Sequence, residues 1–222
     1  LFAQRSEIQY HLNDITSTLA DAQQAARLEN DNAWYQRKLA GAYCSAKYAG
    51  LVPTWDKAVF HAERAVSLAP NNGNYHALLA AVLTEAGQHR RAVEHFQRAN
   101  DLSPQKAGAH YQCAVLWCRM GDQARAREEI RRGNRVLDSS DHFALVRRAQ
   151  AFQELNDHRS ALESLAQAER LFPSNRGTPW LRGISHLALG ENEAAVTAFT
   201  NILNREETPG YAQPTQKHRA LA

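Results

Sequence analysis

The chain has 222 residues, of which 44% are hydrophobic and 22% charged, a balance typical of a folded, soluble protein and not of a disordered or fibrous one. Its 26 basic and 23 acidic side chains give a net charge of +3, too small to indicate a nucleic-acid partner without a concentrated basic patch. No eighteen apolar residues run consecutively, so the sequence predicts no membrane span.

Residues 1–32 predict a helical unit. Ala25 and Leu28 lie 40 residues before Ala65 and Leu68, which indicates a degenerate copy of the unit that follows. A second interpretation is open, in which residues 2–29 form one helix whose apolar side chains follow a heptad-like seam.

Residues 33–72 predict two short antiparallel helices. Leu39 and Tyr43 carry the pattern of the first helix, and Ala58 and Ala62 carry that of the second. The step from this unit to the next is 40 residues, so about six residues are inserted, around positions 50–55.

Four further units follow, over residues 73–106, 107–141, 142–175 and 176–209, and they share one pattern. A small residue precedes a larger apolar one by four positions, and the small residues recur at steps of 34, 35 and 34 residues: Ala92/Phe96, Ala126/Ile130, Ala161/Leu165 and Ala195/Phe199. A second series with these steps marks turns: Gly87, Gly121, Asn156 and Gly190. Each unit therefore predicts two helices, with a left-handed residue after the first.

Residues 208–210, Thr-Pro-Gly, interrupt the pattern. We expect residues 210–222 to form a tail or the beginning of a truncated next helix. The sequence does not begin with methionine, and we expect the chain to be one module of a larger protein.

This pattern resembles the tetratricopeptide repeat family, in which W-x2-L-G-x2-Y precedes A-x3-F and a proline. The unit at 73–106 reads His76-x2-Leu79-Ala80-x2-Leu83, then Ala92-x3-Phe96, then Pro104. Arg148 and Arg182 replace the usual leucine in later units. The resemblance implies an all-α, right-handed α-solenoid of stacked antiparallel helix pairs, with about five repeats over residues 33–209 after a degenerate unit at residues 1–32.

The resemblance also implies a concave groove, lined by the first helices, that receives a peptide or an amphipathic helix of another protein. The family's groove positions are the second, fifth, ninth, twelfth and thirteenth of each repeat. The groove residues expected here are Arg37, Asn74, Ala77, Ala81, Tyr111, Val115, Val146, Gln150, Trp180 and Ile184. Tyr111 and Trp180 are the predicted anchors, since buried aromatic side chains dominate interface energies.

The function that this predicts is a protein–protein interaction scaffold, with self-association left open. The alternative is a regulatory or substrate-docking domain of an enzyme whose catalytic part lies outside these residues. No cofactor, metal site or catalytic activity is expected, because no HExxH, phosphate-loop or G-x-S-x-G motif occurs. His76 and His110 are interpreted as partly buried substitutes for an aromatic residue, and Cys113 as a packing residue.

Three cysteines, Cys44, Cys113 and Cys118, are an odd number without redox or zinc spacing, which favours a reducing compartment and a cytoplasmic location. Six arginines between residues 119 and 135 suggest a nucleic-acid surface, but acidic residues are interleaved with them. We therefore interpret this stretch as a solvated outer face and predict no nucleic-acid partner. An RNA-binding repeat would instead show an affinity that falls steeply with salt.

Overall fold

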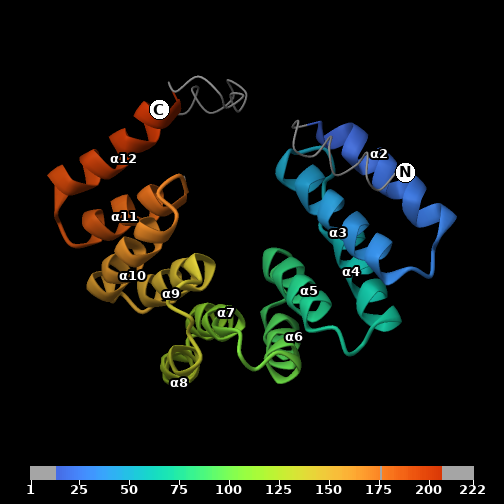
Figure 1. The fold of residues 1–222 in the computed structure, drawn as a ribbon, viewed down its shortest axis with the longest axis horizontal. Helices are drawn as coiled ribbons and strands as arrows, with labels where there is room; N and C mark the ends of the chain where they lie inside the picture. Colours follow the sequence, from blue (N-terminus) through green and yellow to red (C-terminus); the bar gives the residue numbers. More distant parts are fainter. Residues whose placement is uncertain (1–13, 176, 207–222) are drawn as a thin grey trace. The chain divides into compact units, whose positions relative to one another are not determined.

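The computed structural model describes residues 14–175 and 177–206, and the described chain is entirely helical, as predicted (Figure 1). Its eleven helices are α2 (Ile15–Leu28), α3 (Ala33–Tyr48), α4 (Asp56–Leu68), α5 (Gly73–Glu85), α6 (His89–Leu102), α7 (Ala107–Arg119), α8 (Gln123–Arg135), α9 (His142–Glu154), α10 (His158–Leu171), α11 (Gly177–Ala188) and α12 (Asn192–Glu206). Within the described residues, no helix is long and apolar enough to cross a membrane. The chain divides into two compact units, Leu1–Leu137 (unit 1) and Asp138–Ala222 (unit 2).

Polar side chains define where many of the helices begin. Asp122 Oδ1 accepts a hydrogen bond from the backbone N–H of Arg125 at 2.9 Å, and Asp157 Oδ1 accepts one from that of Ser160 at 3.1 Å. Each cap satisfies a backbone donor that has no partner inside the helix and stabilises the helix by about 1 kcal/mol.

The first helix of each pair ends at a left-handed residue, as the spacing predicts. Gly87, Gly121 and Gly190 have φ values of 75°, 85° and 74°, and Asn156 has φ 58°. The next backbone N–H donates to a carbonyl five residues earlier, for example Gln88 N to Leu83 O at 2.8 Å. Glycine and asparagine tolerate this conformation best, so these residue types specify where the chain reverses.

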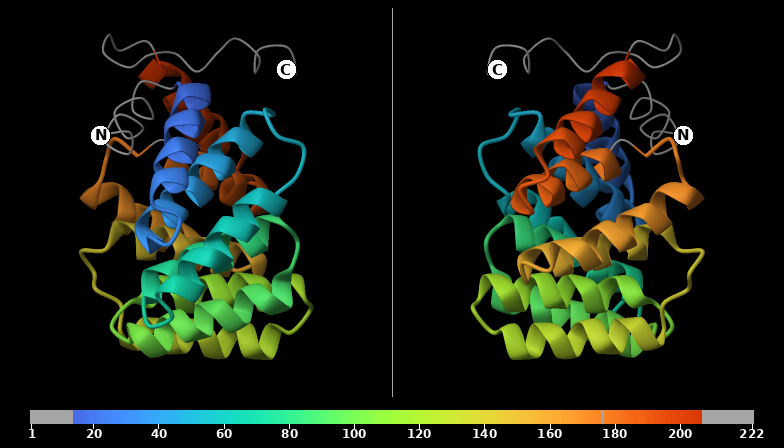
Figure 2. Two further views of the ribbon diagram at one scale, coloured as in Figure 1. Left: turned by 90° about the vertical axis from the view of Figure 1, so that its right-hand side faces the viewer. Right: turned by 90° about the vertical axis from the view of Figure 1, so that its left-hand side faces the viewer.

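In unit 1, three antiparallel hairpins stack one on the next, α3 with α4, α5 with α6, and α7 with α8 (Figures 1 and 2). Small residues lie where the paired helices meet: Ala80 and Ala92, predicted to allow close approach, are both fully buried. Leu83 and Phe96 fill the space beside them. The hairpins thus share one continuous apolar core.

Helix α2 packs against α3, and its side chains Ala22 and Ala26 belong to the same core cluster as Leu39 and Ala40. The first thirteen residues lie outside the described part of the chain. The six-residue insertion falls between α3 and α4, where Trp55 packs edge-on against Tyr48 with ring centroids 5.1 Å apart.

The described residues of unit 2 form two hairpins, α9 with α10 and α11 with α12, and α11 also packs against α10. Its core is built around Ala149, Ala161 and Leu165. Gly183 is buried on α11 because the ring of Phe199 covers it; a Cβ atom there would lie 2.3 Å from Phe199 Cε1.

Candidate partner-binding surface

The expected groove residues all lie on the first helix of a pair, α3, α5 or α7 in unit 1 and α9 or α11 in unit 2. Each unit therefore has its own row of these positions. Their exposure and chemistry differ between the two units.

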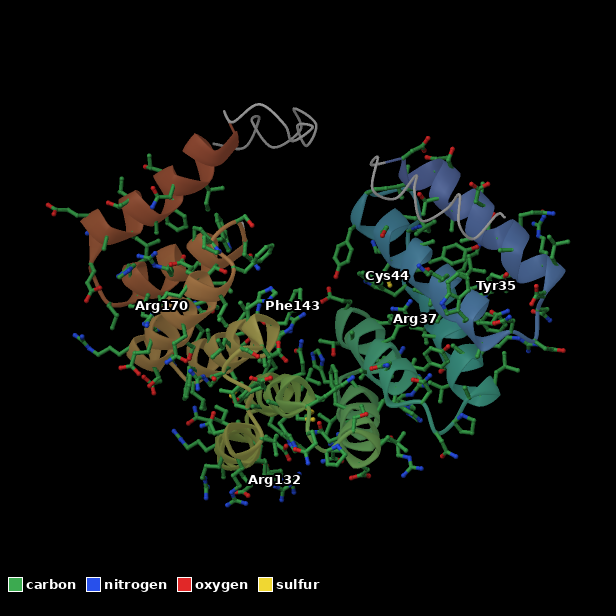
Figure 3. The ribbon with its side chains drawn as sticks, viewed as in Figure 1. Tyr35, Arg37, Cys44, Arg132, Phe143 and Arg170 are labelled. Carbon is green, nitrogen blue, oxygen red and sulfur yellow. The ribbon has the colours of Figure 1, made fainter. Side chains whose placement is uncertain are left out.

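The row of unit 1 is small and polar where it is exposed. Arg37, Asn74 and Ala81 are exposed and Ala77 is half-buried, and Arg37 extends from the side of α3 opposite α2 (Figure 3). Lys106 Nζ donates to Asn74 Oδ1 at 3.0 Å. Apart from Trp34 of α3, which is 39% exposed, this row offers little exposed apolar area, and apolar area is what anchors a partner segment.

The prediction that Tyr111 anchors a partner is wrong. Its side chain is fully buried, and its hydroxyl donates to Asn134 Oδ1 at 2.8 Å. The ring lies against Gly133 of α8, where a Cβ atom would be 2.7 Å from Tyr111 Cε1. Val115 is also buried, with 5% of its surface exposed, so neither side chain is accessible to a partner in this structure.

The sequence contains a signal for the burial of Tyr111, although the repeat pattern alone misses it. Alanine occupies the position of Gly133 in the neighbouring second helices, at Ala99 and Ala168. The missing methyl group at Gly133 makes room for a phenol ring. A glycine in place of alanine in a second helix thus indicates that an aromatic side chain turns inward.

Unit 2 differs because its row is apolar and exposed. Trp180, Ile184 and Leu187 lie on α11 at intervals of four and three residues, with 56%, 38% and 52% of their surfaces exposed. This spacing places them on one face of the helix. The Trp180 ring lies against Phe199 with centroids 5.3 Å apart, so α12 supports it from one side.

Helix α9 adds to this face. Phe143 is 70% exposed and points away from α10, and Val146 and Gln150 are half-buried one and two turns further along α9 (Figure 3). Gln153 Nε2 donates to Leu181 O and to Ser185 Oγ, both at 2.8 Å. These two bonds hold α9 and α11 side by side, so their exposed faces form one surface. We call Phe143, Val146, Trp180, Ile184 and Leu187 the apolar surface.

Phe143 was missed in the choice of groove residues, as was Trp34 of α3, which is 39% exposed. Both occupy the second position of a repeat, the same position as Asn74. The signal was present in the repeat rule, which includes that position. Applied to every repeat, the rule finds both aromatic side chains.

The thiols of Cys44 and Cys113 are unsuited to nucleophilic chemistry. Burial raises the pKa of Cys44 to about 11, with a further contribution from Glu85, and burial raises the pKa of Cys113 further still. A protonated thiol is a poor nucleophile. Among the described residues, no three His, Cys, Asp or Glu side chains gather where they could hold a metal ion.

Two family models match the chain. Residues 54–132 match the model described as anaphase-promoting complex, cyclosome, subunit 3, and residues 143–175 match the model described as tetratricopeptide repeat. The chain belongs to the tetratricopeptide repeat family. The resemblance inferred from the repeat spacing is therefore confirmed. No curated protein matches the sequence.

Solved tetratricopeptide repeat structures share the fold. TTC0263 of Thermus thermophilus is 16% identical over 85% of this chain and 97% of its own, with a TM-score of 0.64. YrrB, described as having an unusual peptide-binding site, is 19% identical over 86% and 90%, with a TM-score of 0.54. A chain of the Cut9–Hcn1 hetero-tetramer of the anaphase-promoting complex is 14% identical over 85% of this chain and 39% of its own, with a TM-score of 0.67. At these identities the likeness shows the fold alone.

Proposed function

We propose that this tetratricopeptide repeat chain holds another protein, and that the apolar surface of α9 and α11 receives an amphipathic helix of that partner. The observation that carries the proposal is the set of large apolar side chains exposed at groove positions of two adjacent first helices. Burying such side chains stabilises a complex by roughly 1.5–3 kcal/mol each when burial is complete.

The shape of this surface favours a helix. Trp180, Ile184 and Leu187 form a stripe along α11, and Phe143 and Val146 form a second one along α9. Two such stripes accept the apolar face of a third helix, whose side chains at intervals of three and four residues fit between them. The hydrogen bonds of Gln153 hold the two stripes in place before the partner arrives, which lowers the entropic cost of binding.

The same surface also suits a docking domain of an enzyme whose catalytic part lies elsewhere. Both candidates use the apolar surface to bind a protein segment, and they differ only in whether a catalytic part lies elsewhere in the protein. The apolar surface is therefore suited to binding a segment of another protein.

The proposal is tested by locating the contact and then measuring it. A photo-crosslinking amino acid at position 187 identifies the partner, and calorimetry with that partner compares Ile184→Ala and Leu187→Ala with Val196→Ala. Val196 is an apolar residue of α12, 64% exposed and outside the apolar surface, so it is a matched control. Truncating a true anchor costs about 2 kcal/mol, or roughly thirtyfold in affinity.

All three variants should keep the melting temperature of the wild type within a few degrees, because the side chains are partly exposed. A thirtyfold loss confined to positions 184 and 187 supports the proposal. Equal affinities for all three variants would place the partner elsewhere on the chain.

A further inference from the structure

The second helices α4, α6, α8 and α10 differ in their balance of charge, and α8 is the most basic of the four. It has five arginines against two glutamates, whereas α4 and α10 each have two basic and two acidic residues, and α6 has three arginines against two acidic residues. The excess positive charge of unit 1 is thus concentrated on its last helix.

The arginines of α8 lie mainly on its outer face. Arg127, Arg131 and Arg135 follow one another at intervals of four residues, which places them about 6 Å apart along one line. Arg132 lies beside this line, on the side of α8 opposite α7 (Figure 3). Ala126, on the opposite face of α8, is fully buried. The arginine line therefore faces the solvent.

The stability of α8 accounts for only part of this line, because Arg131 pairs with Glu128 and Arg135 lies in the last turn, where a cation favours the helix dipole. Like charges four residues apart repel each other in a helix, and cations near the N-terminus oppose the helix dipole. Arg127 is near that terminus, and its side chain donates only to the neutral Gln123, at 3.3 Å. Glu128 is the acidic residue that this face exposes, and it pairs with both Arg131 and Arg132, at 3.1 Å and 3.3 Å.

We propose that the outer face of α8 is a second interaction surface and that it binds an acidic segment of a protein. Arginine suits carboxylates because its planar guanidinium donates two parallel hydrogen bonds. A spacing of about 6 Å matches carboxylates four residues apart on a helix, or alternate residues of an extended strand. Charge complementarity therefore selects an acidic segment whose carboxylates fall on one side.

A protein segment fits this face better than nucleic acid does. The arginine line spans about 12 Å, which is short for a phosphate track. Helix α8 contains no aromatic residue on which a base could stack. Glu128, exposed in the middle of the line, repels a continuous row of phosphates but leaves room between discrete carboxylates.

The test uses the whole chain and a fluorescent twelve-residue peptide of alternating glutamate and alanine, measured by anisotropy at low and physiological salt. The variant Arg127→Gln/Arg131→Gln/Arg135→Gln is compared with Arg27→Gln/Arg98→Gln/Arg159→Gln. The control triple removes the same charge from exposed positions on α2, α6 and α10. Glutamine is a good helix former, so both triples should fold, and circular dichroism checks this.

We expect the α8 triple to weaken binding at least tenfold and to flatten its salt dependence, with the control triple within threefold of the wild type. Equal weakening by the two triples would overturn the proposal, because net charge would then explain the binding. So would the absence of binding by the wild type at low salt. The proposal would also be overturned if a twelve-nucleotide RNA or phosphatidylserine vesicles bound more tightly than the peptide and lost binding in the α8 triple. The outer face of α8 would then be assigned to that class of partner. This inference concerns unit 1 and does not depend on the function proposed for unit 2.

Discussion

At the scale of single residues, glycine controls how closely helices pack in this chain. Gly133 and Gly183 both lie under an aromatic ring, of Tyr111 and Phe199 respectively. Neither glycine has a positive φ, so space and not backbone conformation is what they provide. At both positions the absence of a methyl group makes room for an aromatic ring, which has a larger apolar area than a methyl group.

Gly133→Ala should therefore lower the free energy of unfolding by about 1–3 kcal/mol through overpacking. The new Cβ atom would lie 2.7 Å from the Tyr111 ring, which is fully buried and tied through its hydroxyl to Asn134, so it has no room to move. Urea unfolding followed by circular dichroism measures the change. Gly108→Ala on α7 is the control, because nothing lies within 4 Å of its Cβ position and alanine favours a helix. A Gly133→Ala variant as stable as the control would mean that Tyr111 packs elsewhere.

The position of Tyr111 also shows the limit of the repeat pattern. The pattern predicts the helix and the position of Tyr111 on it, but exposure depends on whether residue 133 of another helix is glycine or alanine. That is a tertiary contact, and a rule based on positions within one helix does not contain it. Trp180 has the same position in its own repeat, and it is 56% exposed.

At the scale of helix pairs, unit 1 joins its helices by partly buried polar contacts at equivalent positions. Gln36 Oε1 lies 2.8 Å from His61 Nδ1, His76 Nδ1 lies 3.0 Å from His95 Nδ1, and His110 Nδ1 lies 2.7 Å from Glu129 Oε2: one contact in each hairpin. His76 and His110 were predicted as partly buried residues at the family's tryptophan position; His110 is half-buried, and His76 is buried more deeply, with 7% of its surface exposed. The pattern could not predict their partners, because these come from the second helix.

The hydrogen bonds of His76 specify its tautomer. Pro70 O can only accept, so His76 Nε2 carries the hydrogen that it shares with that carbonyl at 2.9 Å. Neutral His76 then accepts at Nδ1 from the N–H of His95.

Mild acid should therefore destabilise unit 1. Burial lowers the pKa of His95 below the usual 6.5, with His76 and Arg91 lowering it further against the opposing effect of Glu94 and Glu63. Burial, Lys57 and Arg64 likewise lower the pKa of His61. The unfolded chain then binds protons before the folded chain does, so the stabilisation is complete above the usual histidine pKa and is lost as the pH falls below it.

We expect urea unfolding at pH 5 to require less denaturant than at pH 7.5, and the variant His61→Gln/His95→Gln to show a smaller difference between the two values. Glutamine keeps a hydrogen-bonding group at each position but does not titrate. A variant whose stability changes with pH as much as that of the wild type would assign the effect to other groups.

At the scale of the whole molecule, each of the two units is an array in which a hairpin mainly contacts its neighbours within that unit. In such an array stability is nearly a sum of local terms, so damage to one hairpin stays local. The period of 34 or 35 residues predicts this architecture, since a single hairpin cannot cover its own apolar face. The turn positions, the helix pairs and the small residues of the core follow from the spacing. The chemistry of the exposed rows does not, because it depends on which neighbouring side chains cover each position.

Gly183→Ala tests this locality. Its Cβ atom would lie 2.3 Å from the Phe199 ring and should destabilise the α11–α12 hairpin by about 1–3 kcal/mol. Hydrogen exchange measured by mass spectrometry should then speed up in α11 and α12 and stay unchanged in α3 to α6. Uniformly faster exchange along the whole chain would show instead that all the hairpins unfold together as one cooperative unit.

The left-handed turns that close each hairpin have a consequence for how such a chain can change in length. Gly50, Gly87, Gly121, Asn156 and Gly190 share one backbone conformation, and each is followed by a bond from N–H to the carbonyl five residues back. A gene segment that runs from one of these turns to the next encodes a segment of the length of one hairpin, and its two ends have the same backbone conformation. Duplication or deletion of that segment leaves every chain reversal intact, so the array can lengthen or shorten by recombination without inventing a new loop.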